Sequence, residues 1–413
     1  MRFETVPKDH LKLSEKILIS LIFPLSWNGL NDYITNINYL LLGMFGLGYF
    51  FKLRRSYLPK NSLLLISTIL FSSIYCIFLG QHKLNQVNLI ENKVFNSSRN
   101  IEQSLIYSPL SDLVPALKWI FAIITFNWII QYVSRCRPKL LAPITRAWIF
   151  GVIINIGVQI FQKFNSVSLI KPFLASATSD IVRPPGLASH PNALAITVCM
   201  TLPLLSIQEI QLKSSLKHSA FIAILVSTIF SGSRAGLIVF SITCLILFIK
   251  VSAKNQYRFS IWSILGLVIA SLVILGFLNF IMTHTRLNSA NISSQVSNNE
   301  RKLLLRFGYQ VFAHFPIFGA GTSFLKVSHN LYLQLLSSIG LLGFIAFIYF
   351  SYSILKRKSF FNYSFKIPFI VFLIFGLFNN SLSDFYLYFP ICFSFIEKIN
   401  IGNQEMKNVV TKT

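Results

Sequence analysis

The sequence predicts an all-α polytopic membrane protein. Of its 413 residues, 54% are hydrophobic and 12% are charged, and the mean hydropathy is +0.61. These values lie outside the range of soluble globular domains. Residues 261–281 and 331–351 form uncharged runs of about 20 residues, long enough to cross a hydrocarbon core of roughly 30 Å. We therefore expect a single membrane domain over residues 1–413 with about twelve transmembrane helices.

The expected spans follow one another along the whole chain. The first apolar run, residues 17–30, is followed by further spans, which favours a membrane helix over a cleaved signal peptide. The other spans are expected at residues 37–51, 63–79, 117–133, 147–161, 193–207, 220–230, 235–249, 261–282, 331–355, 367–382 and 385–396. Several are short enough to be tilted, broken or partly interfacial.

Basic residues predict how the chain is oriented. If the spans alternate, 24 of the 37 Lys and Arg residues fall in one set of loops, together with both termini. Because cytoplasmic loops carry the excess of Lys and Arg, we expect both termini, including the tail 398–413, in the cytoplasm. The same bias explains the net charge of +24 without a nucleic-acid partner. The long loops 80–116, 162–191 and 283–330 are then external.

Cysteine and carboxylate patterns give no indication of a metal site. The five cysteines stand alone, so neither a CxxC metal site nor a disulfide framework is indicated. The expected external acidic residues are isolated and lack the paired carboxylates that would hold Mg²⁺ or Mn²⁺ against a diphosphate. We therefore expect no metal and no cofactor, and any bound diphosphate would have to be neutralised by arginines.

Two of the external arginines lie next to helix starts. Arg234 follows Ser231-Gly232-Ser233 in a tight turn between two apolar runs, where it could bind phosphate oxygens bidentately or anchor the helix to lipid headgroups. Arg183 opens the segment RPPGLASHPN, in which Pro191 suits a first helical position and His190 lies near the cap. Arg183 and His190 are candidates for a phosphate or sugar contact, and a solvated charge and a simple cap are the alternatives.

The stretch 299–344 carries the densest polar cluster. Arg301 and Arg306 lie on an expected short amphipathic helix, residues 301–315, and could contact either substrate or lipid headgroups. The Ser/Asn-rich residues just before it, 288–299, are expected to be flexible. After the turn Gly319-Ala320-Gly321, His329 and Asn330 open a long apolar helix. Because histidine titrates near neutrality, His329 could accept a proton from a sugar hydroxyl, and a capping role is the alternative.

Taken in order, these motifs resemble the O-antigen ligase and polymerase family. The resemblance rests on Arg183 to Asn192, Ser231-Gly232-Ser233-Arg234, Arg301, Phe315-Pro316 with Gly319-Ala320-Gly321, and His329-Asn330-Leu331-Tyr332-Leu333 with Gly340-Leu341-Leu342-Gly343. It covers roughly residues 183–344. Family members are polytopic, GT-C-like helical glycosyltransferases of the bacterial inner membrane. They move a glycan from a polyprenyl diphosphate carrier to a glycan or lipid-core acceptor without a metal.

The resemblance also implies roles for single residues. Arg183, Arg234 and Arg301 would bind the diphosphate, and His329 would activate the acceptor hydroxyl for inverting attack at the external face. Where the family often has Trp, four residues after the arginine matching Arg301, this chain has Leu305, so Arg306 could share that arginine's role.

Two other functions compete with the transferase. A lipid-linked oligosaccharide flippase or other transporter would also need many helices and arginines, but it should place charge near the bilayer midplane. A non-catalytic polysaccharide-assembly protein could retain the fold without turnover. The concentration of charge at the expected external mouth favours the enzyme. In this interpretation the partners are the lipid-linked donor, the acceptor and membrane lipids.

Overall fold

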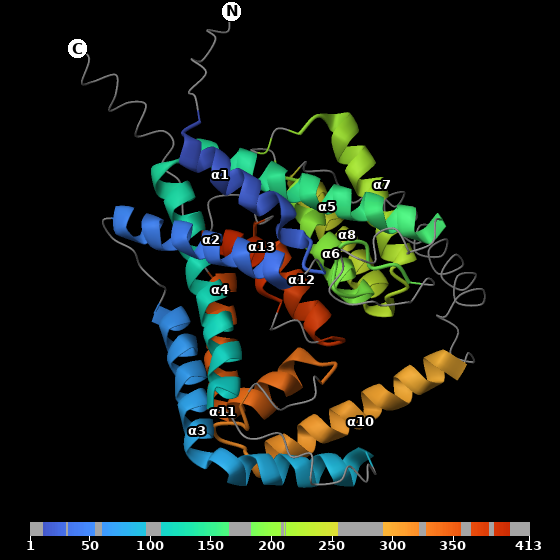
Figure 1. Ribbon diagram of the computed structural model, residues 1–413. Helices are drawn as coiled ribbons and strands as arrows, with labels where there is room; N and C mark the ends of the chain where they lie inside the picture. Colours follow the sequence, from blue (N-terminus) through green and yellow to red (C-terminus); the bar gives the residue numbers. More distant parts are fainter. Residues whose placement is uncertain are drawn as a thin grey trace, which may run out of the picture.

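The computed structural model describes residues 11–29, 32–53, 60–95, 109–164, 183–207, 210, 212–254, 292–321, 328–356, 365–379 and 384–396. Every regular element in this part of the chain is helical, which confirms the all-α class for the described residues (Figure 1). The span expected at residues 261–282 and the tail 398–413 lie outside the described residues.

Helices follow one another through both halves of the chain. The first half contains α1 (Leu13–Ile22), η1 (Phe23–Ser26), α2 (Asp32–Lys52), α3 (Lys60–Phe95), α4 (Pro109–Cys136), η3 (Pro138–Leu140) and α5 (Leu141–Phe164). The second half contains α6 (Pro191–Leu205), α7 (Ser214–Phe230), α8 (Arg234–Lys254), α10 (Ile292–His314), α11 (Leu331–Lys356), α12 (Ile367–Gly376), η8 (Phe385–Leu387), α13 (Tyr388–Cys392) and η9 (Phe393–Phe395).

Within the part of the chain that the structure describes, four helical segments are long and apolar enough to cross a membrane: Ser62–Gly80, Leu113–Cys136, Pro138–Phe164 and Leu331–Lys356. Five shorter apolar helices accompany them, at Pro191–Leu205, Ser214–Phe230, Arg234–Ile249, Ile367–Gly376 and Phe385–Phe395. The total of twelve spans stays a prediction.

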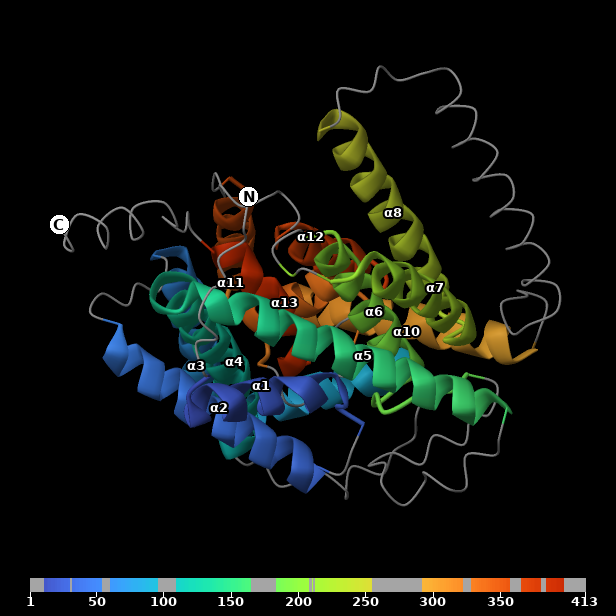
Figure 2. The ribbon, with the colours of Figure 1, turned by 90° about the horizontal axis from the view of Figure 1, so that it is seen from above.

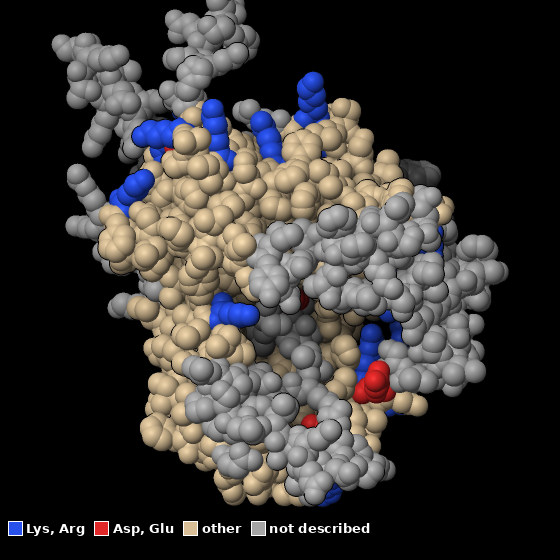
Figure 3. All heavy atoms as spheres, viewed as in Figure 1, with Lys and Arg blue, Asp and Glu red and all other residues tan. Residues whose placement is uncertain are grey.

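Apolar side chains also cover much of the molecular surface. On α11, Leu341, Ile345, Ile348 and Tyr352 are exposed at helical spacing and form a stripe suited to lipid. Lys and Arg side chains gather along the upper edge of the face in Figure 3.

The helix α3 bends sharply at Gly80, whose φ of 50° and ψ of −129° are not helical. Beyond the bend, Val87, Ile90 and Val94 recur every three or four residues and pack on Phe307 and the neighbouring apolar side chains of α10. Figure 1 shows the two segments side by side at the bottom of the view. The loop expected from residue 80 onward is thus helical as far as Phe95, because this stripe finds an apolar partner.

The helix α11 is broken at Gly340, where φ is 66°. A side chain there would overlap the backbone of Ile317 and Phe318. The predicted Gly-Ala-Gly turn fits into this break. Its amides at Ala320 and Gly321 donate to carbonyl oxygens of α11 at 2.8 and 3.0 Å, and the amide following Gly340 donates to the Pro316 carbonyl at 2.8 Å.

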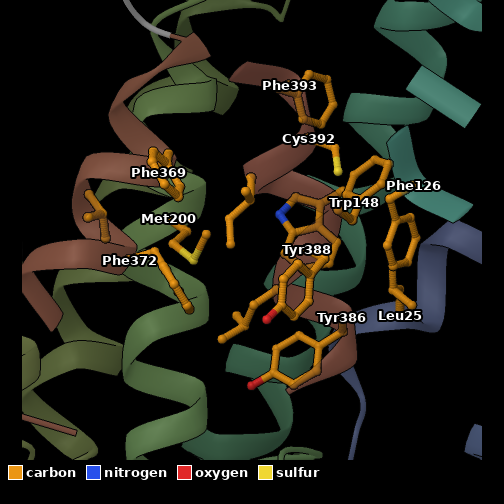
Figure 4. Packing of buried hydrophobic residues seen from close by; sticks show 14 of the residues in the cluster. Leu25, Phe126, Trp148, Met200, Phe369, Phe372, Tyr386, Tyr388, Cys392 and Phe393 are labelled. Atoms are coloured by element: carbon orange, nitrogen blue, oxygen red, sulfur yellow. The ribbon is translucent and has the colours of Figure 1, made fainter. Parts of the chain in front are cut away.

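The main apolar core joins α4, α5, α6, α12 and α13 around the buried Trp148 (Figure 4). The indole N–H of Trp148 donates to Thr201 Oγ1 of α6 at 3.0 Å, so the ring's polar atom is satisfied inside the core. Helices α6, α7 and α8 pack against one another, and Figure 2 shows them gathered on one side of the molecule. This packing positions the two short segments that carry the predicted site: the loop before α6 and the turn between α7 and α8.

The helix α10 is longer than the expected segment at residues 301–315, since it begins at Ile292. The Ser/Asn-rich residues expected to be flexible are therefore helical from position 292. Helix α10 packs against α3 and α11, which brings Arg301 and His329 into one region.

Candidate functional site

Three buried amides on one side of α5 hold the loop that carries Arg183 and His190. Asn155, Gln159 and Gln162 are spaced four and three residues apart and so face the same way. Asn155 accepts a hydrogen bond from a loop N–H at 2.7 Å, Gln159 donates to a loop carbonyl at 3.1 Å, and Gln162 accepts at 2.8 Å and donates at 3.0 Å. These amides replace water as partners of the buried loop backbone.

Gly186 allows this close approach between the loop and α5. Its φ is +65°, a conformation that favours glycine, and a Cβ at this position would overlap the Asn155 side chain. The glycine of the sequence motif is therefore required both for the turn and for the contact with α5.

Arg183 extends from this loop to the turn between α7 and α8. Its Nε donates to the Ser231 carbonyl at 3.0 Å, and Nη2 donates to Asn192 Oδ1 at 3.4 Å. Gly232, with φ +57°, lies against the same side chain, because a Cβ there would be 3.2 Å from Arg183 Nε. Arg183 is thus held in a defined position beside the Ser-Gly-Ser-Arg turn.

The Ser-Gly-Ser-Arg turn starts α8 and directs Arg234 toward α10. Ser233 caps the helix by accepting the Gly236 N–H on its hydroxyl at 3.1 Å. Arg234 is the first residue of α8 and is half-buried. Its Nη2 donates to Asn298 Oδ1 of α10 at 2.7 Å, so two elements far apart in the sequence meet at this guanidinium.

Arg301 lies one helical turn after Asn298, close to Arg234. Burial lowers the pKa of Arg301, and the like charge of Arg234 lowers it further. The Arg301 Nε is buried and has no hydrogen-bond partner among the described residues. A buried, unpaired donor is costly. A bound anion would supply the missing acceptor and reduce the repulsion between the two arginines.

Arg306 lies away from this pair. It is exposed, and its five-residue offset from Arg301 turns it by about 140° around an ideal α-helix. His314 is also exposed, at the end of α10.

His190 forms the N-cap of α6, as its sequence position predicted, with Pro191 as the first helical residue. Its Nδ1 accepts the Ala193 backbone N–H at 2.9 Å. Burial, together with the charges of His329 and Arg183, lowers the pKa of His190 to about 4. The ring is therefore neutral at pH 7.

His329 directly precedes the capping residue of α11 and is half-buried. Its Nδ1 lies 3.2 Å from Asn379 Oδ1, beyond the end of α12. Burial lowers the pKa of His329, and Arg301 lowers it further, whereas the Asn379 hydrogen bond and Glu300 act in the opposite direction. Like His190, His329 is neutral at pH 7.

Asn330 is the residue that caps α11. Its Oδ1 accepts the Leu333 N–H at 2.9 Å, and its Nδ2 donates to the Leu377 carbonyl at 3.0 Å. Both ends of the side chain are engaged inside the protein, and these contacts fasten the start of α11 to the end of α12 next to His329.

Electrostatic coupling links the cluster into one continuous site. Arg183 and His329 act on the pKa of His190, Arg301 acts on that of His329, and Arg234 acts on that of Arg301. Five of the seven predicted site residues therefore share one region, and Asn330 adjoins it through His329. The arrangement offers guanidinium donors for an anion next to a neutral imidazole.

Residues 219–348 match a family model described as O-antigen ligase. This stretch of the chain is similar to O-antigen ligases. The resemblance drawn from the motifs is thus confirmed by an independent comparison. No curated protein matches the chain significantly.

The O-antigen ligase match covers only part of the cluster. Arg234, Arg301 and His329 lie inside the matched residues, whereas Arg183 and His190 precede them and Asn379 follows them. The fold joins these three to the O-antigen ligase segment.

Sequence reasoning missed five amide side chains of this site: Asn155, Gln159, Gln162, Asn298 and Asn379. In α5, the three-and-four spacing of amides in an otherwise apolar helix was a usable signal, because polar groups inside a membrane helix need partners. Asn298 and Asn379 had no comparable signal, since their partners lie 64 and 50 residues away.

Proposed function

We propose that this protein is an inverting, metal-independent glycosyltransferase. It moves a glycan from a polyprenyl diphosphate carrier to a hydroxyl of a glycan or lipid-core acceptor. The match of residues 219–348 to the O-antigen ligase model supports the general class. The donor, the stereochemistry and the residue roles are inferred from the cluster itself.

The observation that carries the proposal is the pair formed by Arg234 and Arg301. Two half-buried guanidinium groups repel each other, and the Nε of Arg301 has no hydrogen-bond partner among the described residues. A diphosphate would satisfy that donor and neutralise both charges, and arginine forks are suited to phosphate oxygens. Arg183, on the other side of the turn, would contribute a third guanidinium as charge develops on the leaving diphosphate. We assign this binding role to Arg301 rather than to the exposed Arg306.

His329 supplies the acid–base chemistry in this proposal. A neutral imidazole can accept the proton of the acceptor hydroxyl as its oxygen attacks the anomeric carbon. The bond between that carbon and the diphosphate oxygen breaks, and the electron pair leaves with the diphosphate. Since a single displacement inverts the anomeric centre, no covalent sugar–enzyme intermediate is required.

In the membrane, we place the site at the external face and both termini in the cytoplasm. The distribution of basic residues between the expected loops supports this orientation. The lipid part of the donor would then lie in the bilayer, against the exposed apolar side chains, with its diphosphate at the arginine cluster.

Transfer by the purified protein tests the proposal. We expect His329→Ala to abolish transfer from a polyprenyl diphosphate glycan while the protein remains folded in detergent, and we expect a chelator to leave the wild-type rate unchanged. His314→Ala is the matched control, because His314 is exposed and lies outside the cluster. Wild-type transfer by His329→Ala would refute the assignment of the base, and transfer that stops with the chelator would refute metal independence.

Deletion of the protein in cells distinguishes the two kinds of acceptor. Loss of attached polysaccharide with carrier-linked long chains would indicate a ligase, and accumulation of single repeats would indicate a polymerase.

A further inference from the structure

Both histidines of the site have one ring nitrogen committed to a neighbour, and the two neighbours differ in kind. His190 Nδ1 faces a backbone N–H, which can only donate. His190 Nδ1 must therefore carry a lone pair, and in the neutral ring the proton lies on Nε2. The N-cap geometry of α6 thus selects the tautomer of His190 that can donate from Nε2.

His329 Nδ1 faces the side-chain oxygen of Asn379, which can only accept. In that pair the proton of His329 lies on Nδ1, and Nε2 keeps its lone pair. Asn379 is 5% exposed, and its own backbone N–H donates to the Phe375 carbonyl at 3.0 Å. The contact between Asn330 and the Leu377 carbonyl fastens the same short turn to the start of α11. The backbone of Asn379 is therefore set in place by two helices, while its Nδ2 is buried without a hydrogen-bond partner among the described residues.

We propose that Asn379 is a positioning residue that makes His329 Nε2 the proton acceptor, and that α6 holds His190 in the opposite tautomer, as a donor. This inference rests on the proposed function. One neutral histidine then takes the proton from the acceptor hydroxyl, while the other donates a hydrogen bond to a substrate oxygen without adding charge to an already cationic site.

The surroundings of His329 explain why a neutral amide suits this position. Arg301 and Glu300 act on it from α10, and His190 lies near it in the loop before α6, with Arg183 acting in turn on His190. A carboxylate in place of Asn379 would favour the imidazolium, which cannot accept a proton. Asparagine orients the ring and leaves it neutral.

In the transfer step, the O–H bond of the acceptor breaks and its proton passes to His329 Nε2. The acceptor oxygen bonds to the anomeric carbon, and the diphosphate leaves with the electron pair. The imidazolium that forms is stabilised by the Asn379 oxygen on its other nitrogen, and it returns its proton to water after the product leaves.

Selective ¹⁵N-histidine labelling of the full-length protein in detergent reads the tautomers without any turnover. The chain has seven histidines, so the His329→Ala and His190→Asn spectra assign the two signals, and His314→Gln is a control that should remove neither. We expect Nδ1 of His329 and Nε2 of His190 to carry the protons. The reverse tautomer at either ring would overturn the proposal, even if the wild-type protein transfers glycan.

The pH dependence of transfer supplies a second test. Asn379→Asp keeps the accepting oxygen, and its added negative charge should raise the pKa of His329. In a plot of kcat against pH, the acidic limb of this variant should therefore lie at higher pH than that of the wild type. Asn379→Leu removes the acceptor and should lower kcat by about ten-fold or more with little change in the KM of the donor. An unshifted acidic limb in Asn379→Asp would overturn the positioning role. If the wild-type protein shows no transfer at all, the proposed function fails, while the labelling result still stands on its own.

Discussion

Acidification should loosen the loop before α6, because His190 must be neutral to cap the helix. Its pKa is lowered from 6.5 to about 4. Between pH 4 and pH 6.5, the folded protein therefore binds fewer protons at His190 than the unfolded chain does. This contribution to stability is present above pH 6.5 and is lost as the pH falls toward 4. The full shift corresponds to roughly 3 kcal/mol, and the part already lost at pH 5 to roughly 2 kcal/mol.

His190→Asn isolates this effect. Asparagine caps helices well but does not titrate, so the variant should lose less stability between pH 7.5 and pH 5 than the wild type. Thermal unfolding of both proteins in the same detergent at the two pH values gives the comparison. The pH-dependent contributions of all other titratable groups are the same in both proteins and cancel in the difference. The wild type should lose about 2 kcal/mol more than the variant. Equal losses would refute the assignment of a buried, neutral cap.

Two further substitutions test the arginine pair and the α5 amides. Arg301→Lys should lower the transfer rate by about ten-fold or more, because an ammonium does not reproduce a bidentate fork. Arg306→Lys is its matched control. Equal effects of the two substitutions on the rate would contradict the assignment of diphosphate binding to Arg301 and not to Arg306. Gln159→Leu should lower the free energy of unfolding by about 2 kcal/mol, because the Pro184 carbonyl and the Ser227 hydroxyl each lose a hydrogen bond to Gln159. Unchanged unfolding in denaturant would show that these contacts contribute little.

Local features of the site could be predicted from the sequence because they depend on neighbouring residues. Pro191 after His190 indicates a capped helix start, and Ser-Gly-Ser before Arg234 indicates a turn into a helix. Each of these signals lies within a few residues, and the structure confirms both. The all-α class likewise followed from composition.

Features that depend on distant contacts could not be predicted. Which of Arg301 and Arg306 lies beside Arg234 depends on the face that α10 presents to α8, and composition does not determine that rotation. The bends at Gly80 and Gly340 were hidden because a single glycine in an apolar run is compatible with a straight helix. Asn379 became a candidate only when the fold placed it next to His329.

The break in α11 at Gly340 separates the two ends of that helix mechanically. In a continuous α-helix, one inserted residue rotates everything beyond it by about 100°. Here the half that begins after His329 is fixed by its own hydrogen bonds to the segment 316–321, and the Ser72 hydroxyl of α3 donates to the Ser338 carbonyl at 3.2 Å. Past the break, the Leu341 and Leu342 amides donate to the Pro316 and Ile317 carbonyls, so both halves of α11 are attached to this segment. A change in α11 beyond Leu342 would therefore be separated from His329 by these two sets of hydrogen bonds instead of being passed along one continuous helix.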